Sequence, residues 1–366
     1  MSQATQLNSM MKFFNNDERN ALESIEFAQY IAFAPVVFQA TIALRDLGIL
    51  AAVEKTGKEG ITAAEIVSTT GLPAYGVRVL LEGGLGIGVL IINDDRYSLT
   101  KTGHYILQDE MTRANMDFVQ DICYRGLFDL TKSIQTGKPE GLKTLGNWPT
   151  IYEGLAYLKP QEQKSWFAFD HFYSSDSFPV VLPHVFDNHP KKILDIGGNT
   201  GKWALKCAAY NNEVKVTIAD LPGQLRMAES NISKAGFSDR VTFHQINILD
   251  ETAKLPTGHD VIWMSQFLDC FSENEIISIL KRCNEALDDN GQVFILEPFW
   301  DRQKFKVSAF CLQMTSLYFT NIANGNSQMY HSGLFTELIE TAGFQVTDRI
   351  DKIGVSHTLL KCRKAS

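Results

Sequence analysis

Side chains that could bind a charged ligand gather around one glycine-rich turn. The run Ile193-Leu-Asp-Ile-Gly-Gly-Asn-Thr-Gly201 is typical of a strand that enters a turn and then opens a helix. Glycines there let backbone amides approach a ligand at the carboxyl edge of an α/β sheet. Asp195, inside the run, would repel a pyrophosphate and suits a cationic ligand better. Asn199 stands where glycine is usual, and Asn tolerates left-handed backbone angles.

A second acid follows at the end of the next apolar run. Asp220, in Ala219-Asp-Leu-Pro222, comes about twenty-five residues after Asp195, a spacing that suits hydrogen bonds to ribose hydroxyls. A helix-capping role is the alternative for this Asp. Together the two motifs indicate a nucleoside-type ligand. S-adenosylmethionine, which carries a sulfonium and an ammonium group, matches the charge.

Alternating strands and helices are expected to position these acids. Short apolar runs rich in β-branched residues recur after Pro190, at 193–196, 215–219, 241–245, 260–263 and 292–296. Helical stretches such as 224–235 and 273–287 separate them. This alternation predicts βαβ units and a mostly parallel sheet, which two further strands at 345–350 and 357–361 complete.

The first hundred residues predict helices followed by a small wing. Thr62-Ala-Ala-Glu65 is a capping box, a second helix follows from Ala74, and 89–92 and 96–99 predict a hairpin. This winged-helix outline raises the question of DNA binding. From Glu54 to Lys101, however, there are five basic and six acidic residues. This balance of charge cannot supply the phosphate neutralisation that DNA binding needs.

Composition excludes several other classes of protein. The 366 residues are 45% hydrophobic and 21% charged, as in globular proteins, and the formal net charge is −8. Six scattered Cys and eight dispersed His predict neither a disulfide framework nor a metal site. Residues 27–44 carry no charge but include Gln29 and Pro35, so we expect a buried or subunit-interface helix and no membrane span. We expect a cytoplasmic protein.

Taken together, these motifs resemble the small-molecule O-methyltransferases of the caffeate and hydroxyindole type. Besides the motifs above, the resemblance rests on Tyr97-Ser-Leu-Thr-Lys-Thr-Gly103, the Thr136-Gly-Lys-Pro139 patch, Phe271-Ser-Glu-Asn-Glu275 and the Ala-Gly-Phe that ends at Phe344. It implies a Rossmann-like class I methyltransferase domain with a seven-stranded sheet, preceded by a winged-helix domain that forms a homodimer. We expect a flexible segment at 1–18, the dimerisation domain at 19–110, a helical connection at 111–188 and the methyltransferase domain at 189–366.

The resemblance also implies a set of cofactor contacts. Asp195, Gly197 and Gly201 would hold the methionine end of S-adenosylmethionine, and Asp220 would bind its ribose. Asn247 stands where the family usually has Asp near the adenine, and Ser265 near a position often taken by Lys. The full set of expected contacts is Asp195, Gly197, Gly198, Asn199, Gly201, Asp220, Leu221, Asn247, Ile248, Ser265 and Gln266.

The catalytic end departs from the family. Its pattern W-x-x-H-D-W-S-D places a His that takes the proton from the acceptor, whereas Gln266-Phe-Leu-Asp-Cys-Phe-Ser-Glu273 places Asp269 there. An ordinary Asp is about six pKa units below a phenol, although burial could raise it towards 7. Asp269 would therefore act as the base or orient the acceptor. Glu297 and His331 are the other catalytic candidates, and His171 is a further possible base.

Aromatic and thioether side chains crowd two segments, 166–178 and 305–330. As a set they favour a small aromatic acceptor, and O-methylation is the expected reaction. The residues expected in the acceptor pocket are Phe169, Tyr173, Met314 and Tyr330. Two other functions stay open: an S-adenosylmethionine-binding protein with other chemistry or none, and a winged-helix regulator that senses a small ligand.

Overall fold

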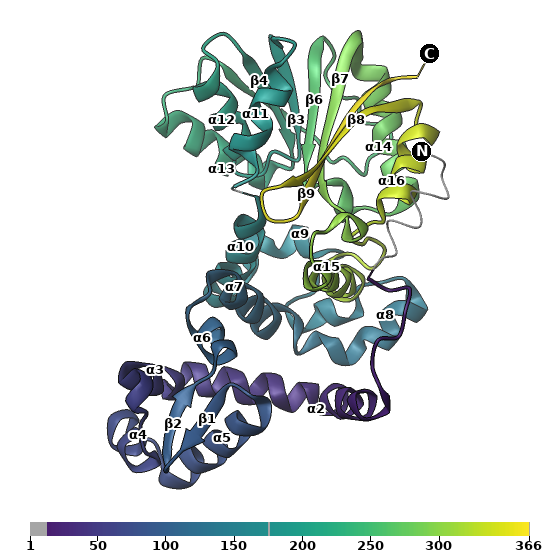
Figure 1. The fold of residues 1–366 in the computed structure, drawn as a ribbon. Helices are drawn as coiled ribbons and strands as arrows, with labels where there is room; N and C mark the ends of the chain where they lie inside the picture. The colour runs from purple at the N-terminus through teal and green to yellow at the C-terminus, as the bar shows by residue number, and fades with distance from the viewer. Residues whose placement is uncertain (1–12, 175, 366) are drawn as a thin grey trace. The chain divides into compact units, whose positions relative to one another are not determined.

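The computed structural model describes residues 13–174 and 176–365 of the chain (Figure 1). The side chains of His171, Tyr173 and Ser174 are outside this description, as are residues 1–12, which make up most of the expected flexible segment. The described chain forms two compact units, Phe14–Val119 and residues 120–365. The border between them lies nine residues beyond the end of the expected dimerisation domain.

The first unit has the expected winged-helix outline. Thr62 caps its third helix with the predicted capping box: Thr62 Oγ1 accepts from the Glu65 N–H, and the Glu65 carboxylate accepts from the Thr62 N–H. Asp94 and Asp95 both adopt positive φ and turn the chain between the two strands of the wing. The elements are α2 (Ala21–Asp46), α3 (Ile49–Thr56), α4 (Ala63–Thr70), α5 (Ala74–Ile87), β1 (Leu90–Asn93), β2 (Arg96–Leu99), α6 (Lys101–Gln108) and α7 (Glu110–Phe118).

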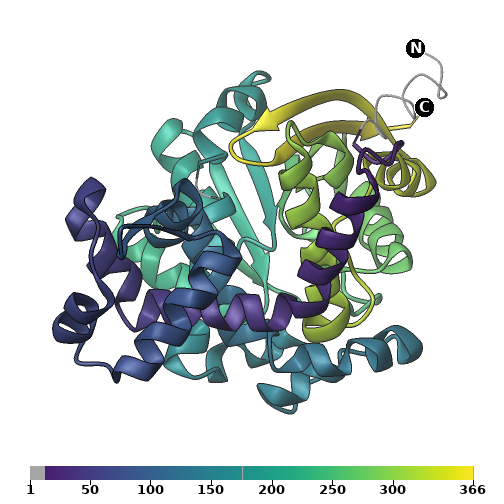
Figure 2. The same ribbon diagram turned by 60° about the horizontal axis from the view of Figure 1, so that its bottom comes forward.

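Helix α2 leaves most of its apolar side chains exposed. Pro35 lies inside it, and Figure 2 shows the helix axis changing direction part-way along, as expected where proline removes a backbone donor. Ile31, Phe33 and Val36 are each about 60% exposed. By length and composition α2 is apolar enough to span a membrane, the one such helix in the described chain. Its apolar face therefore needs a partner that a single chain does not supply.

The second unit contains a mixed sheet of seven strands in the order β5-β4-β3-β6-β7-β9-β8. The first five of these are parallel neighbours, and the hairpin β8–β9 adds to β7 antiparallel. This confirms the predicted, mostly parallel sheet. The strands are β3 (Lys192–Ile196), β4 (Lys215–Asp220), β5 (Val241–Gln245), β6 (His259–Ser265), β7 (Leu287–Pro298), β8 (Phe344–Ile353) and β9 (His357–Lys364).

Helices cover both faces of this sheet, as a buried parallel sheet requires. One apolar cluster joins α14 and α16 to one face, and a second joins α11, α12 and α13 to the other (Figure 1). The helices of this unit are α8 (Leu130–Thr136), α9 (Ile151–Gly154), α10 (Pro160–Ser174), α11 (Phe178–Phe186), α12 (Lys202–Tyr210), α13 (Pro222–Lys234), α14 (Glu273–Ala286), α15 (Lys306–Tyr318) and α16 (Ser332–Thr341).

Two helices far apart in the sequence meet beside the sheet. Trp166 on α10 donates its indole N–H to the hydroxyl of Tyr318 on α15 over 2.9 Å, and both side chains are buried. The two aromatic-rich segments are therefore joined by a buried hydrogen bond.

Candidate active site

The glycine-rich turn follows the central strand, where the strand order reverses. β3 pairs with β4 on one side and β6 on the other, so Asp195 lies opposite Ile218 and Trp263. In open α/β sheets, ligands bind outside the carboxyl ends of the strands at such a switch point. The sequence motif is thus at the edge where this architecture forms a site.

Glycine is required twice in this turn because neighbours approach too closely for a side chain. A Cβ on Gly197, which has φ of +73°, would lie 2.2 Å from the ring of Phe267. A Cβ on Gly198 would lie 2.7 Å from the Asp195 carboxylate. Asn199 adopts φ of +50°, the left-handed conformation expected of an Asn here. The turn thus holds its backbone directly against Asp195.

Asp195 is a buried carboxyl with an unused oxygen. Its side chain is 2% exposed, and Oδ2 has no hydrogen-bond partner among the described residues. Burial, with a smaller contribution from the charge of Asp220, raises the pKa of Asp195 well above its usual range. Such an orphaned buried oxygen is costly unless a ligand uses it. It fits a group that brings a positive charge or N–H donors into the turn.

Asp220 ties the turn to the neighbouring strand. Its Oδ2 accepts from the Asn199 N–H over 2.8 Å, and its Oδ1 accepts from the Leu221 N–H over 2.7 Å. Desolvation nevertheless raises the pKa of Asp220. Asp220 therefore has a structural task beside any ribose contact, because each carboxylate oxygen retains a second lone pair.

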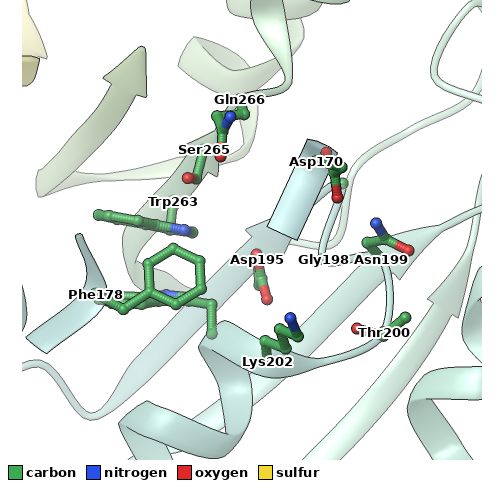
Figure 3. A pocket seen from close by; sticks show the side chains of 12 residues that line it. Asp170, Phe178, Asp195, Gly198, Asn199, Thr200, Lys202, Trp263, Ser265 and Gln266 are labelled. Atoms are coloured by element: carbon green, nitrogen blue, oxygen red, sulfur yellow. The ribbon is translucent and has the colours of Figure 1, made fainter. Parts of the chain in front are cut away.

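A pocket of about 540 Å³, part of it open solvent, lies at this edge (Figure 3). Its walls come from α10, α11, the turn after β3, the start of α12 and the end of β6. The lining residues are Asp170, Phe178, Asp195, Gly197, Gly198, Asn199, Thr200, Lys202, Trp203, Trp263, Ser265 and Gln266. Six of the eleven expected cofactor contacts are among them.

The other five expected contacts lie outside this lining. They are Gly201, Asp220, Leu221, Asn247 and Ile248. Asn247 is exposed just beyond β5, and its side-chain oxygen accepts from the Leu249 N–H over 3.1 Å. Ile248 is buried. The pocket thus includes Asp195 and Gly197 of the expected methionine end but not Gly201, and the expected ribose and adenine contacts follow the ends of β4 and β5.

The turn after β6 carries a buried acid. Gln266 adopts φ of +46°, a rare conformation for a side chain of this kind, and its N–H donates to Leu296 O. Asp269, three residues on, is 4% exposed and accepts from the Cys270 thiol over 3.4 Å. The same turn therefore places Gln266 in the lining of the pocket and contains Asp269.

Glu297 fixes this turn from the neighbouring strand. It lies near the end of β7 and is 1% exposed. Its Oε1 accepts from the N–H groups of Phe267 and Leu268, over 2.9 and 2.8 Å. Desolvation, and next the charge of Asp269, raises the pKa of Glu297 well above its usual range. These two hydrogen bonds give Glu297 a positioning role for the turn.

Burial raises the pKa of Asp269 toward the value that a proton acceptor for a phenol needs. Desolvation raises its pKa to about 7; the Cys270 hydrogen bond opposes this shift, and the nearby charge of Asp170 adds a smaller increase. A carboxylate with such a pKa is a far better proton acceptor from a phenol than an ordinary Asp.

The same shift predicts how stability depends on pH. The unfolded chain releases the Asp269 proton near pH 3.8, and the folded chain near pH 7, so the stability of the wild type falls as pH rises through this interval. Asp269→Asn removes the loss, and we expect the apo variant to be more stable than wild type by on the order of 1–4 kcal/mol at pH 8.

Urea unfolding followed by tryptophan fluorescence at pH 5 and pH 8 measures this difference. All five Trp residues belong to the second unit, so the signal reports on it alone. Asp289→Asn is the control: this acid is fully exposed, and its surface ion pair with Lys364 should contribute less than about 1 kcal/mol. A gain for Asp269→Asn that is equal at both pH values would contradict the assignment.

The remaining expected site residues occupy different surroundings. His331 caps α16: its Nδ1 accepts from the Gly333 N–H over 3.0 Å, and its Nε2 lies 3.8 Å from Asp301. Tyr330 is 1% exposed in the core and donates to Phe271 O. Met314 on α15 is 44% exposed, and Phe169 is partly buried on α10. Tyr173 belongs to α10, but its side chain is outside the described part of the chain.

Sequence reasoning missed two charged residues of the pocket. Asp170 reaches it from α10, and Lys202 is the first residue of α12. Asp170 directly follows Phe169, one of the residues expected in the acceptor pocket. Lys202 offered a clearer signal, because a cation is unfavourable at a helix N-terminus. Within the described residues, no cluster of three His, Cys, Asp or Glu side chains could hold a metal ion.

Two family models match this chain in the order of its two units. Residues 26–97 match a Dimerisation2-like domain, and residues 180–345 match an O-methyltransferase domain that contains the pocket's glycine turn and Asp269. The chain thus combines a Dimerisation2-like domain with an O-methyltransferase domain, and its homologues are S-adenosylmethionine-dependent small-molecule O-methyltransferases. It is a methyltransferase, and S-adenosylmethionine is its cofactor. The buried, unpaired Asp195 oxygen and the glycine cradle fit that sulfonium cofactor.

Individual relatives align along most of the chain. An L-tyrosine C(3)-methyltransferase from Streptomyces lavendulae is 25% identical and covers 89% of each chain. A 3-hydroxy-5-methyl-1-naphthoate 3-O-methyltransferase from Streptomyces sahachiroi is 24% identical, over 77% of this chain and 79% of its own. The solved structure of the S-adenosylmethionine-dependent methyltransferase SibL superposes with a TM-score of 0.70 at 24% identity, covering 92% and 98% of the two chains.

The dimerisation domain accounts for the exposed face of α2. A homodimer is the assembly that this domain supports, and we expect the apolar side chains of α2 to be buried in it. We expect the double change Ile31→Glu and Val36→Glu to convert the dimer to single chains, because two carboxylates would be buried in an apolar interface. Light scattering after gel filtration measures the molar mass. Lys58→Glu, at an exposed position off α2, should leave the dimer intact; a dimer that survives the double change would exclude α2 from the interface.

Proposed function

We propose that this methyltransferase transfers the methyl group of S-adenosylmethionine to a phenolic hydroxyl of a small aromatic acceptor. One observation carries the proposal: the turn that closes the cofactor pocket with Ser265 and Gln266 also holds the buried base Asp269. The names of the two aligned relatives, which act on tyrosine and on a hydroxynaphthoate, support an aromatic acceptor.

The acceptor would meet an environment rich in phenol rings. Tyr318 is buried and Tyr152 is half-buried, and desolvation raises the pKa of Tyr152 with smaller contributions from Cys270 and Asp269. Tyr318 is fixed by Trp166. The surroundings of Asp269 are therefore rich in aromatic rings, which suits an aromatic acceptor.

The cofactor supplies an electrophilic methyl group on its sulfonium. The protein aligns the acceptor oxygen with that methyl group and removes the phenol proton. Because Asp269 has a pKa of about 7, the difference between its pKa and that of a phenol falls from about six units to about three. Glu297 keeps Asp269 in place through the Phe267 and Leu268 N–H groups. Orientation of the acceptor oxygen toward the methyl group provides the rest of the rate.

Transfer of a deuterated methyl group tests this proposal. The purified protein is incubated with S-adenosylmethionine labelled in the methyl group and a panel of hydroxybenzoates, hydroxynaphthoates and tyrosine, and products are analysed by mass spectrometry. We expect label on the oxygen of at least one acceptor. Label on a ring carbon would replace O-methylation by C-methylation, since a phenolate reacts at either atom. Bound cofactor with no labelled product from any class would favour other chemistry on the same fold.

We also propose a cytoplasmic location, because the relatives aligned here are biosynthetic methyltransferases and their cofactor is a cytoplasmic metabolite. We further propose that His331 takes no part in proton transfer, because its Nδ1 lone pair caps α16 by accepting from the Gly333 N–H.

A further inference from the structure

We infer that Lys202 and Asp170 divide the zwitterionic end of S-adenosylmethionine between them, Lys202 binding its carboxylate and Asp170 its ammonium group. This inference rests on the proposed cofactor site. It assigns two residues of this chain to the amino-acid end of the ligand.

The two charges enter the same pocket from different helices. Figure 3 shows Lys202 extending from the start of α12 toward Asp195 and Gly198, and Asp170 on the other side of this space. Both groups are partly removed from water: desolvation lowers the pKa of Lys202 and raises the pKa of Asp170 to about 6, and each charge opposes the shift of the other. A cation and an anion on facing walls match an α-amino acid group.

The position of Lys202 points to an anion. It is the first residue of a nine-residue helix, whose free N–H groups carry a partial positive charge. No acidic residue occupies the first turn of α12 to compensate. An ammonium group in that place is unfavourable by itself, and it becomes favourable when a carboxylate binds between it and the helix end.

Two unused donors strengthen the case for a bound carboxylate. The indole Nε1 atoms of Trp203 and Trp263 are buried and have no hydrogen-bond partner among the described residues. Both side chains are at most 2% exposed, both line the pocket, and their rings stack at 3.9 Å. Buried donors without partners are rare and costly, so a pocket that contains two of them is suited to an acceptor-rich ligand group.

The acid side of the pocket complements this arrangement. Asp170 and the orphaned Oδ2 of Asp195 both line it, so an ammonium group has carboxylates to bind. Asp195 is still expected to face the positively charged cofactor from the glycine turn. Asp170 is then the second acid, and its side chain comes from outside the sheet.

Binding of four nucleosides tests the assignment without any turnover. Calorimetry compares S-adenosylmethionine, S-adenosylhomocysteine, decarboxylated S-adenosylmethionine and 5′-methylthioadenosine on wild type and on Lys202→Met. We expect the change to weaken binding of the first two by about 10–100-fold, because a charge-assisted hydrogen bond is lost. Binding of decarboxylated S-adenosylmethionine and methylthioadenosine, which lack the carboxylate, should be unchanged. Lys206→Met, at an exposed position one turn along α12, is the matched control.

A second variant separates the two halves of the zwitterion. Asp170→Asn should weaken the three ligands that carry an ammonium group, decarboxylated S-adenosylmethionine included, and spare methylthioadenosine. An equal loss for all four ligands in Lys202→Met, or no loss for any, would overturn the inference and show that Lys202 does not bind the carboxylate. If wild type binds none of the nucleosides, the proposed cofactor site itself fails; selective failure in the variants refutes this assignment only.

Discussion

Asp195→Asn should reduce the affinity for S-adenosylmethionine at least 100-fold. The wild-type carboxylate is buried with one oxygen unused, so the cofactor's positive charge meets it in a medium that screens little. Asn is of the same size and keeps the turn intact, but it removes the charge. A thermal-shift titration measures the effect, because a saturating ligand stabilises the folded state and a weakly bound one does not.

The apo form of the same variant provides the control for folding. Burial makes the charged form of Asp195 unfavourable, so Asn at this position should leave the apo protein at least as stable as wild type. A variant that is well folded and still stabilised by the cofactor as strongly as wild type would show that Asp195 does not bind it.

Asp269→Asn should lower kcat by about 10²–10⁴-fold while leaving cofactor affinity unchanged, as expected when a general base is removed. In the wild type, activity should rise with pH through about 7, because Asp269 accepts a proton only once it is ionised. The variant should lack this limb. Steady-state kinetics from pH 5.5 to 9 with a phenolic acceptor gives both results.

Glu297→Gln is the matched comparison for that experiment. Gln keeps an oxygen that accepts from the Phe267 and Leu268 N–H groups, and it removes the ionisable acid at nearly the same size. We expect a small loss of kcat and an unchanged limb near pH 7. Full activity in Asp269→Asn, or loss of the limb in Glu297→Gln alone, would transfer the role of base to Glu297.

The sheet and its glycine turn could be predicted because local patterns specify them. Strands buried on both faces form continuous apolar runs, so β3 to β7 stand out, and a charged Asp195 inside such a run is conspicuous. The capping box at Thr62 and the left-handed Asn199 are equally local. The exposure of the apolar side chains of α2 could not be predicted from the sequence, because a core helix and an interface helix have the same apolar composition.

Other parts of the site depend on tertiary packing, which one sequence does not reveal. Asp170 reaches the pocket because α10 lies at the edge of the sheet, far from β3 in the chain. Tyr330, expected at the acceptor, is buried in the core, and His331 beside it caps a helix. Aromatic residues in one segment thus separate into core and pocket according to which face of the element they occupy. Lys202 could have been identified from the sequence, because a cation at a helix N-terminus opposes the helix dipole.

Calorimetric titration of the wild-type protein tests whether the glycine turn around Asp195 binds S-adenosylmethionine. We expect saturable binding of S-adenosylmethionine and S-adenosylhomocysteine, one molecule per chain, with Kd values in the micromolar range. Absence of saturable binding for both nucleosides up to millimolar concentration would contradict it, because the buried acid and the glycine cradle would then have no ligand to explain them.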